Sequence, residues 1–371
     1  NKDVKATYFK NVNLVTPQPL NVVGYPDVNR SIYPIPNQQK FINPLTGAGL
    51  PSSAGTSAFN AVYVTNDKRG VYASLTAKVD KQFRDGFGAS LAYVKTFANS
   101  LFDGGGDQPL SAWQGTPTYN SPNTPTLGYS GFTVPDRLVA AFTYRKEYFK
   151  HFATTISMMY AGSIDYRFSY VYAADFNRDG STGNDLIYIP KDPSEISFVD
   201  LPAGASTSQV AYSANDQSAL FFKYIDQDKY LRAHKGQYAE RNGAQAPWRN
   251  QVDIKLIQDL FMNVGKTKNT VQLTLDIFNF GNLINANWGK VRTVNASSIL
   301  VPVNATNTTN VAASINGAAV SLPAYQPGGT TQPYYRLQTD RGHPVVDTFR
   351  DNVSVASTYY MQMGIRYIFN N

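Results

Sequence analysis

Two-faced strands of about ten residues recur along this chain, and they limit its fold more than any other feature. In the stretch Gly70–Phe83, positions 71, 73, 75, 77 and 79 are all apolar, whereas the positions between them are mostly polar. In the last strand, Tyr359–Phe369, every odd position is apolar or aromatic. Because successive side chains of a strand point to opposite faces, such segments predict strands with one apolar face.

The predicted strands are joined alternately by short and long connections. Short turns are expected near Asp85, Glu147 and Lys266, and Asp85-Gly86 is a strong hairpin signal. The other predicted strands lie at 3–9, 87–93, 137–145, 151–160, 250–256 and 269–279, with 261–268 joining the last two. The long connections lie at 13–57, 100–131, 171–246 and 282–354. This pattern predicts an all-β fold, a transmembrane antiparallel β-barrel with long extracellular loops whose apolar face contacts outer-membrane lipid.

Composition fits this class and argues against others. Hydrophobic residues make up 42% of the 371 residues and the mean hydropathy is -0.32, and no run approaches the roughly 20 apolar residues of a membrane-spanning helix. The 33 basic and 26 acidic residues are scattered, so no nucleic-acid partner is predicted. A soluble β-sandwich also alternates, but it would carry loops of similar length at both ends.

About eight spanning strands are expected from this pattern. An open sheet cannot lie in lipid, because the backbone amides at its edges would lack hydrogen-bond partners. Two alternatives therefore stay open. Either the strands close on themselves as a small barrel, or the rest of a larger barrel lies outside this sequence.

Four segments, in this order, resemble the C-terminal part of TonB-dependent outer-membrane receptors, specifically the Oar-like group of Bacteroidota. They are "DFNRDGSTGNDLIYIP" (Asp175–Pro190), "QYAERNGAQAPWRNQVDIKLIQD" (Gln237–Asp259), "LTLDIFNFGNLINANWG" (Leu273–Gly289) and "MGIRYIF" (Met363–Phe369). The resemblance implies that residues 1–371 are the C-terminal portion of a barrel of about 22 strands, with the plug domain and TonB box absent. The chain departs from the family by ending in Asn370-Asn371 after the aromatic Phe369.

The resemblance also implies a transport function, the uptake of an unidentified substrate across the bacterial outer membrane. Its implied partners are the N-terminal barrel and plug portion of the same protein, and TonB acting through that portion. Lys78, Asp80, Asp253, Lys255 and Asp276 lie on the polar faces of predicted strands and are candidates to line the route, although interior walls also carry such residues as plain salt bridges. The alternative function is a surface structural or interaction protein that binds a matrix, a surface lipoprotein or a secretion partner.

The segment "DFNRDGSTGND" predicts a structural calcium ion. Asp175, Asn177 and Asp179 hold the first, third and fifth positions of an EF-hand-like loop, and Gly180 holds the sixth. Ser181 could add its backbone carbonyl, whereas Asp185 stands one place before the twelfth position, which is Leu186. The expected role is to pin the long 171–246 loop, and the alternative is an Asx-rich turn that bonds its own backbone.

No enzymatic activity is predicted. His151, His234 and His343 are far apart, and neither HExxH nor GxSxG occurs, although an embedded hydrolase site assembled only in space stays open. One helix is predicted at Asn215–Gly236, with Asn215 as its cap. Leu220, Phe221, Tyr224 and Ile225 would form its packing face.

Overall fold

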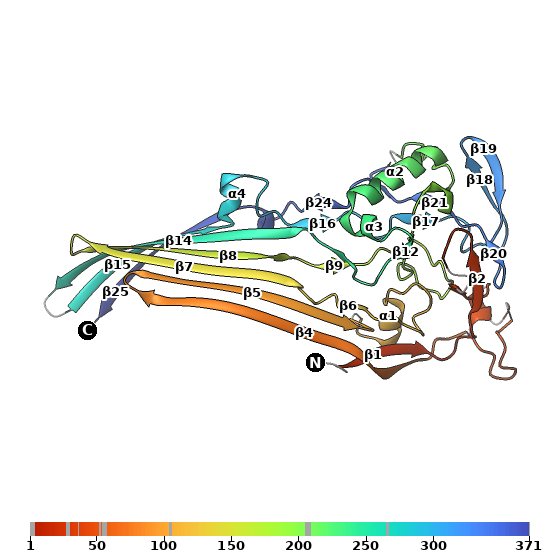
Figure 1. Ribbon diagram of the computed structural model, residues 1–371, viewed down its shortest axis with the longest axis horizontal. Helices are drawn as coiled ribbons and strands as arrows, with labels where there is room; N and C mark the ends of the chain where they lie inside the picture. The colour runs from red at the N-terminus through yellow and green to blue at the C-terminus, as the bar shows by residue number, and fades with distance from the viewer. Residues whose placement is uncertain are drawn as a thin grey trace.

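A long antiparallel sheet carries a folded unit of loops at one end (Figure 1). The computed structural model describes residues 4–26, 30–35, 37–51, 53, 58–103, 106–204, 209–264 and 267–370. The sheet has the strand order β1-β4-β5-β7-β8-β14-β15-β25, with β6 paired to β5. Its long strands are β1 (Val4–Asn11), β4 (Val62–Arg84), β5 (Phe87–Ser100), β7 (Asp136–Tyr148), β8 (Phe152–Ile164), β14 (Trp248–Val264), β15 (Thr267–Phe278) and β25 (Tyr360–Asn370).

The remaining elements belong to the loops. The short strands are β2 (Gln18–Val22), β3 (Arg30–Ile32), β6 (Gly128–Tyr129), β9 (Arg167–Phe168), β10 (Tyr188–Ile189), β11 (Ser197–Phe198), β12 (Gln237–Tyr238), β13 (Ala244–Gln245), β16 (Arg292–Val294), β17 (Leu300–Pro302), β18 (Val311–Ile315), β19 (Ala318–Leu322), β20 (Thr330–Thr331), β21 (Tyr334–Leu337), β22 (Thr339–Asp340), β23 (His343–Pro344) and β24 (Phe349–Asp351). The helices are α1 (Pro109–Gln114), α2 (Ala214–Gln227), α3 (Lys229–Ala233) and α4 (Phe280–Ile284), with 3-10 turns at Asn37–Lys40, Pro193–Glu195 and Val355–Ser357. No helix among the described residues is long and apolar enough to cross a membrane.

The turns explain how the strands reverse direction. Asp85 and Gly86 take positive φ values of 57° and 79°, the left-handed geometry of a tight hairpin. Phe149 and Lys150 also take positive φ values at the next turn. This turn comes later in the sequence than the predicted position, Glu147, because β7 continues to Tyr148. The predicted connection around 261–268 was too long, since β14 and β15 stay paired down to Val264 and Thr267. The Lys266 turn itself, like Asp3, falls outside the described residues.

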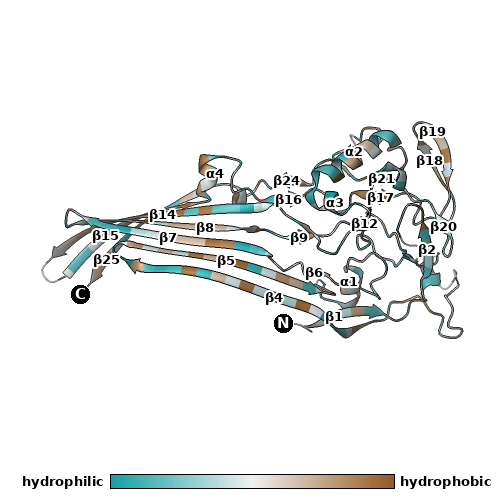
Figure 2. Ribbon diagram, in the orientation of Figure 1, coloured by the Kyte–Doolittle hydropathy of each residue, from teal (hydrophilic) through white to brown (hydrophobic). Residues whose placement is uncertain are grey.

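One face of the sheet, here called the apolar face, carries the odd positions of β4, β5 and β25 and the residues paired with them. Large apolar side chains on this face are exposed, and Met363 and Ile365 reach 79% and 76% exposure. Others on it are Leu75, Val79, Leu91, Tyr144, Ile156, Met158, Leu260, Val271, Leu273, Met361, Tyr367 and Phe369. Figure 2 shows the alternation of hydrophobic and hydrophilic residues along the strands. The prediction of two-faced strands is therefore confirmed.

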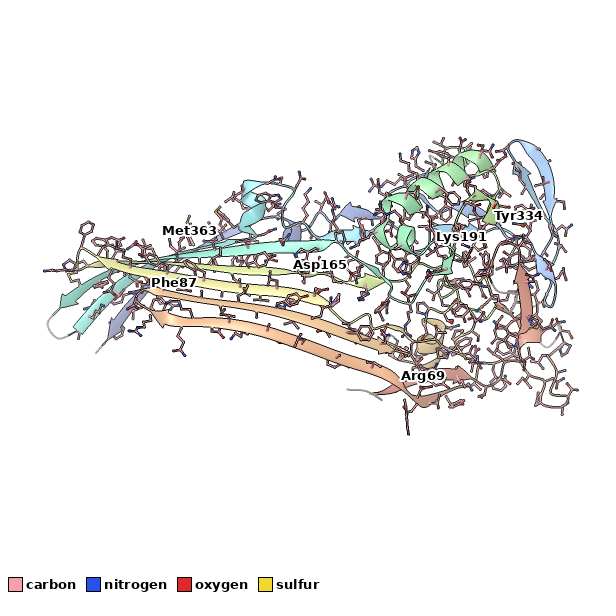
Figure 3. All side chains as sticks on the ribbon, viewed as in Figure 1. Arg69, Phe87, Asp165, Lys191, Tyr334 and Met363 are labelled. Carbon is pink, nitrogen blue, oxygen red and sulfur yellow. The ribbon has the colours of Figure 1, made fainter. Side chains whose placement is uncertain are left out.

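The buried core of the molecule lies among the loops. The larger cluster joins residues from three long loops, including Leu20, Ile32, Tyr172, Phe221 and Leu300. A smaller one joins Leu14, Tyr33, Phe41, Leu50 and Trp113. Figure 3 shows side chains crowded around Lys191 and Tyr334 at the loop end. The 171–246 loop is thus packed into a core that it shares with two other long loops.

The predicted helix is two helices. Ser213 caps α2 through a capping box with Asp216, in place of the expected Asn215. Asp228 ends α2 and caps α3 by accepting from the Leu231 amide at 2.8 Å. The predicted packing face is confirmed, because Phe221, Tyr224 and Ile225 are buried and Leu220 packs against the same cluster.

Candidate functional site

Residues 175–185, here called the acidic segment, lie inside the unit formed by the long loops. Asn177, Asp179, Ser181 and Asp185 are buried there. Arg178 and Gly180 take positive φ values of 62° and 97°, which fold the segment back on itself. Asp175 accepts hydrogen bonds from the amides of Asp179 (3.0 Å) and Gly180 (2.8 Å). The segment therefore wraps its backbone around its first carboxylate.

The middle carboxylate is bonded in the same way. Asp179 accepts from the Ser181 amide at 2.8 Å and from the side-chain amides of Asn184 (3.1 Å) and Asn177 (3.3 Å). Ser181 Oγ turns away and donates to the Gln114 carbonyl at 2.9 Å. Most oxygens predicted to bind calcium thus already accept hydrogen bonds, as an Asx-rich turn requires.

Lys40, from the first long loop, reaches into this segment. Its Nζ donates to the Asp179 carbonyl at 2.8 Å, and a Cβ on Gly180 would fall 2.1 Å from that nitrogen. Gly180 is therefore needed both for its φ and for the room it leaves to Lys40. Burial, more than the neighbouring Asp179 carboxylate, raises the pKa of Asp175 to about 7.

Asp185 is the least satisfied of the predicted ligands. Its Oδ2 accepts from the Phe176 amide at 2.8 Å, but its Oδ1 is buried without a hydrogen-bond partner among the described residues, as is Oδ1 of Asn184. Burial raises the pKa of Asp185 well above its usual value. The hard oxygen donors suit calcium. However, no group of three or more acidic, His or Cys side chains among the described residues has the arrangement of a metal site.

A buried arginine that sequence reasoning missed lies beside this segment. Arg30 is fully buried, and its guanidinium carbon lies over the rings of Phe176 (4.4 Å), Tyr238 (5.3 Å), Tyr172 (5.6 Å) and Tyr25 (5.9 Å). It donates to the Leu186 carbonyl at 3.4 Å. The guanidinium of Arg30 thus lies next to the acidic segment and is itself surrounded by aromatic rings.

The predicted residues of the polar face contact each other or the loops. Lys78 pairs with Asp80 at 3.0 Å, and Lys255 with Asp276 at 2.8 Å. Asp253 accepts from the Asn279 amide at 2.8 Å. A further pair, Arg145 with Asp259 at 2.7 Å, was not predicted. These contacts agree with the simpler interpretation, in which the charged residues of the polar face form salt bridges and hydrogen bonds within the protein.

The histidines do not form a common site. His151 lies 3.1 Å from the Phe261 carbonyl, whereas His343 lies 3.2 Å from the Tyr212 hydroxyl. His234 stacks on Tyr230, with its Nδ1 2.8 Å from that residue's carbonyl. Each histidine thus contacts a different element.

The apolar face ends at two rows of paired residues, one on each side. Toward the loops, Tyr93, Leu138, Gly162 and Asn250 are neighbours on successive strands. Beside them, Lys95 and the Tyr93 hydroxyl donate hydrogen bonds to Asp136. Trp248 and the Tyr160 hydroxyl donate hydrogen bonds to Asn250. Toward the turns, the neighbours are Tyr148, Phe152, Leu260, Val271 and Tyr367. The face therefore has aromatic and polar groups at both ends.

In comparisons with known proteins, no family model, no curated protein and no solved structure matches this chain.

Proposed function

We propose that this chain is a wall segment of an outer-membrane transport barrel that resembles the TonB-dependent receptors and takes up an unidentified substrate. The observation that carries the proposal is the exposed apolar face between the two rows of aromatic and polar residues. A soluble protein rarely leaves so large an apolar surface in water. In lipid the same surface needs no cover.

The height of the apolar face supports a membrane. Leu138 and Tyr148 mark its two limits on β7 and are ten residues apart. Ten residues of strand span roughly 33 Å, and a strand tilt of about 40° reduces this to roughly 25 Å, the height of the apolar band of outer-membrane barrels. The polar Thr154 and Gln258 inside the band bond each other at 2.6 Å. Lys146, near the turn end, can extend its amine toward the interface.

The two edges of the sheet support a larger barrel. No described residue pairs with β4 between Thr76 and Arg84 on the side opposite β5, or with β25 on the side opposite β15. β1 pairs with the loop end of β4, so the outermost strands are β1, which runs toward the loops, and β25, which runs toward the turns. In lipid, the unpaired part of β4 and the free edge of β25 would leave backbone amides without hydrogen-bond partners. Further strands would satisfy these edges, and we assign them to the N-terminal barrel portion that would also carry the plug and meet TonB.

Cysteine labelling of whole cells tests the placement. Residues 1–371 contain no cysteine, so Leu45→Cys in the first long loop, where the native side chain is 92% exposed, would be the one thiol in this part of the protein. Asp85→Cys at the β4–β5 turn is the matched control, with 86% of the native side chain exposed. We expect an impermeant thiol reagent to label Leu45→Cys in intact cells, and Asp85→Cys only after the outer membrane is opened. The reverse pattern would invert the topology, and equal labelling would contradict a membrane wall.

We also propose that the acidic segment binds a structural calcium ion. Calcium needs ionised carboxylates, so binding must displace the proton that Asp175, with its pKa of about 7, holds at lower pH. We therefore expect affinity to rise between pH 6 and pH 8. A chelator, or Asp179→Ala, should also expose Arg178, whose Nε now donates to the Ala305 carbonyl at 2.7 Å, to protease.

Asp340→Ala, at an exposed ion pair with Arg350, is the matched control for the calcium test. It should leave protection unchanged. Protection that does not change with chelator, together with calorimetry that detects no calcium binding, would assign the segment to an Asx-rich turn held by Lys40.

A surface structural protein is the second candidate. The two buried cores of the loop unit favour this function, because loops that only surround the opening of a barrel would not need such packing. The mass of the native subunit discriminates between the two. A subunit much larger than the 40.9 kDa of this chain that binds TonB supports transport, whereas one of about 41 kDa excludes the larger barrel.

A further inference from the structure

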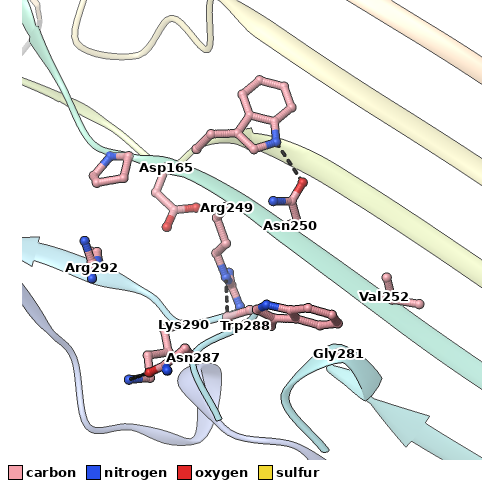
Figure 4. Close-up of a pocket in the computed structure, with 12 residues that line it drawn as sticks. Asp165, Arg249, Asn250, Val252, Gly281, Asn287, Trp288, Lys290 and Arg292 are labelled. Carbon is pink, nitrogen blue, oxygen red and sulfur yellow. Dashed lines mark hydrogen bonds between the residues drawn. The ribbon is translucent and has the colours of Figure 1, made fainter. Parts of the chain in front are cut away.

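A cavity of about 340 Å³ lies beside β14 at the loop end of the sheet (Figure 4). The pairing of β14 with β15 begins at Ile254 and Ile277, so residues 248–253 of β14 extend beyond β15. The segment from α4 to Arg292 lies along this part of β14 and closes the cavity. The cavity is thus built where the apolar face meets the loops.

Two tryptophans give the cavity an amphipathic wall. Trp248 and Trp288 line it and are 41% and 55% exposed. Nε1 of Trp248 donates to Asn250 at 2.9 Å, which fixes the ring at the row that ends the apolar face. Indole rings favour the boundary between lipid tails and headgroups, because one part of the ring is apolar and the other donates a hydrogen bond.

Three cations line the same cavity with Asp165 as the one carboxylate among its described lining residues. Arg249 donates to the carbonyls of Gly289 (3.3 Å) and Ala356 (2.7 Å). Lys290 and Arg292 both contact Asp351, at 2.7 and 3.3 Å. Three cations therefore face two carboxylates, and the guanidinium and ammonium groups have more N–H donors than these contacts use. The balance favours an anion.

We propose that this cavity binds the anionic phosphate headgroup of an outer-leaflet lipid. The inference rests on the membrane placement proposed above. Val252 lines the cavity, and Ile254 and Leu256 continue the apolar face below it, so acyl chains can follow β14 downward while the phosphate stays among the cations. A soluble anion would use the cations but not the exposed indoles or the apolar strand beneath them.

Tryptophan quenching by brominated lipids tests the inference. The full natural protein is placed in bilayers that contain the same fraction of brominated lipid with either a phosphatidic acid or a phosphatidylcholine headgroup. Of the three tryptophans in residues 1–371, Trp113 is buried among the loops and should stay unquenched. We expect the anionic lipid to quench the exposed tryptophans several-fold more strongly than the zwitterionic lipid.

Variants separate the headgroup site from simple insertion. Lys290→Gln with Arg292→Gln should remove the preference for the anionic lipid and keep the quenching common to both lipids. Arg350→Gln, an exposed arginine that does not line the cavity, should keep the preference.

The other outcomes are decisive in different ways. Equal quenching by both lipids in the unaltered protein would overturn the headgroup site and leave the membrane wall standing. A preference abolished by inorganic phosphate, but not by chloride at equal ionic strength, would assign the cavity to a soluble anion. The absence of any quenching would place the cavity outside the bilayer and contradict the proposed function as well.

Discussion

Ile365→Arg is expected to prevent most of the protein from assembling in the outer membrane. Ile365 lies near the middle of the apolar face on β25, paired with Leu273, and is 76% exposed. An arginine facing lipid at the midplane costs about 2–4 kcal/mol, which is roughly a 30- to 700-fold loss in the folding equilibrium. The measurement is the heat-sensitive gel migration of folded barrels in isolated outer membranes.

Two controls on the same strand test the direction of the side chains. Gln362→Arg and Ile368→Arg place the same charge on the polar face, where Gln362 is exposed and Ile368 is half-buried beside Thr270. Both should assemble nearly normally. If all three variants assembled equally well, the apolar face would not contact lipid.

The long strands of the sheet could be predicted from sequence because each of their features is local. Alternation along a strand depends on neighbouring residues, and Asp85-Gly86 encodes its own positive φ values. The errors at 261–268 and at Glu147 concern strand ends, where pairing with a neighbour extends a strand beyond its apolar pattern. The unpaired edges of the sheet could not be predicted in this way, because the sequence of a strand does not show which other strand pairs with it.

The loop unit was largely unpredictable for the opposite reason. Lys40 and Asp179 meet across 139 positions of sequence, and Arg30 meets the rings of Tyr172 and Phe176 from a different loop. The acidic pattern marked residues that lie together in one folded segment, because they lie within eleven positions of each other. It could not reveal Lys40, whose ammonium group donates to the Asp179 carbonyl.

The cluster around Arg30 yields the other large effect. Arg30→Ala should destabilise the loop unit by roughly 3–5 kcal/mol, the cost typical of breaking a buried ionic arrangement. The change removes a cation stacked among four rings and leaves Asp185, whose Oδ1 already lacks a partner among the described residues, without its nearby guanidinium. We expect the loops to become protease-sensitive at a lower temperature, while the long sheet is unchanged.

Two variants make the Arg30 result interpretable. Arg350→Ala removes an exposed arginine from an ion pair with Asp340 and should change loop stability by less than about 0.5 kcal/mol. Arg30→Lys keeps the charge but loses the flat guanidinium that stacks on Phe176, so its loss should fall between the other two. If Arg30→Lys were as damaging as Arg30→Ala, the stacking would matter more than the charge. If Arg30→Ala were no worse than Arg350→Ala, Asp185 would be protonated and would need no cation, as its raised pKa allows.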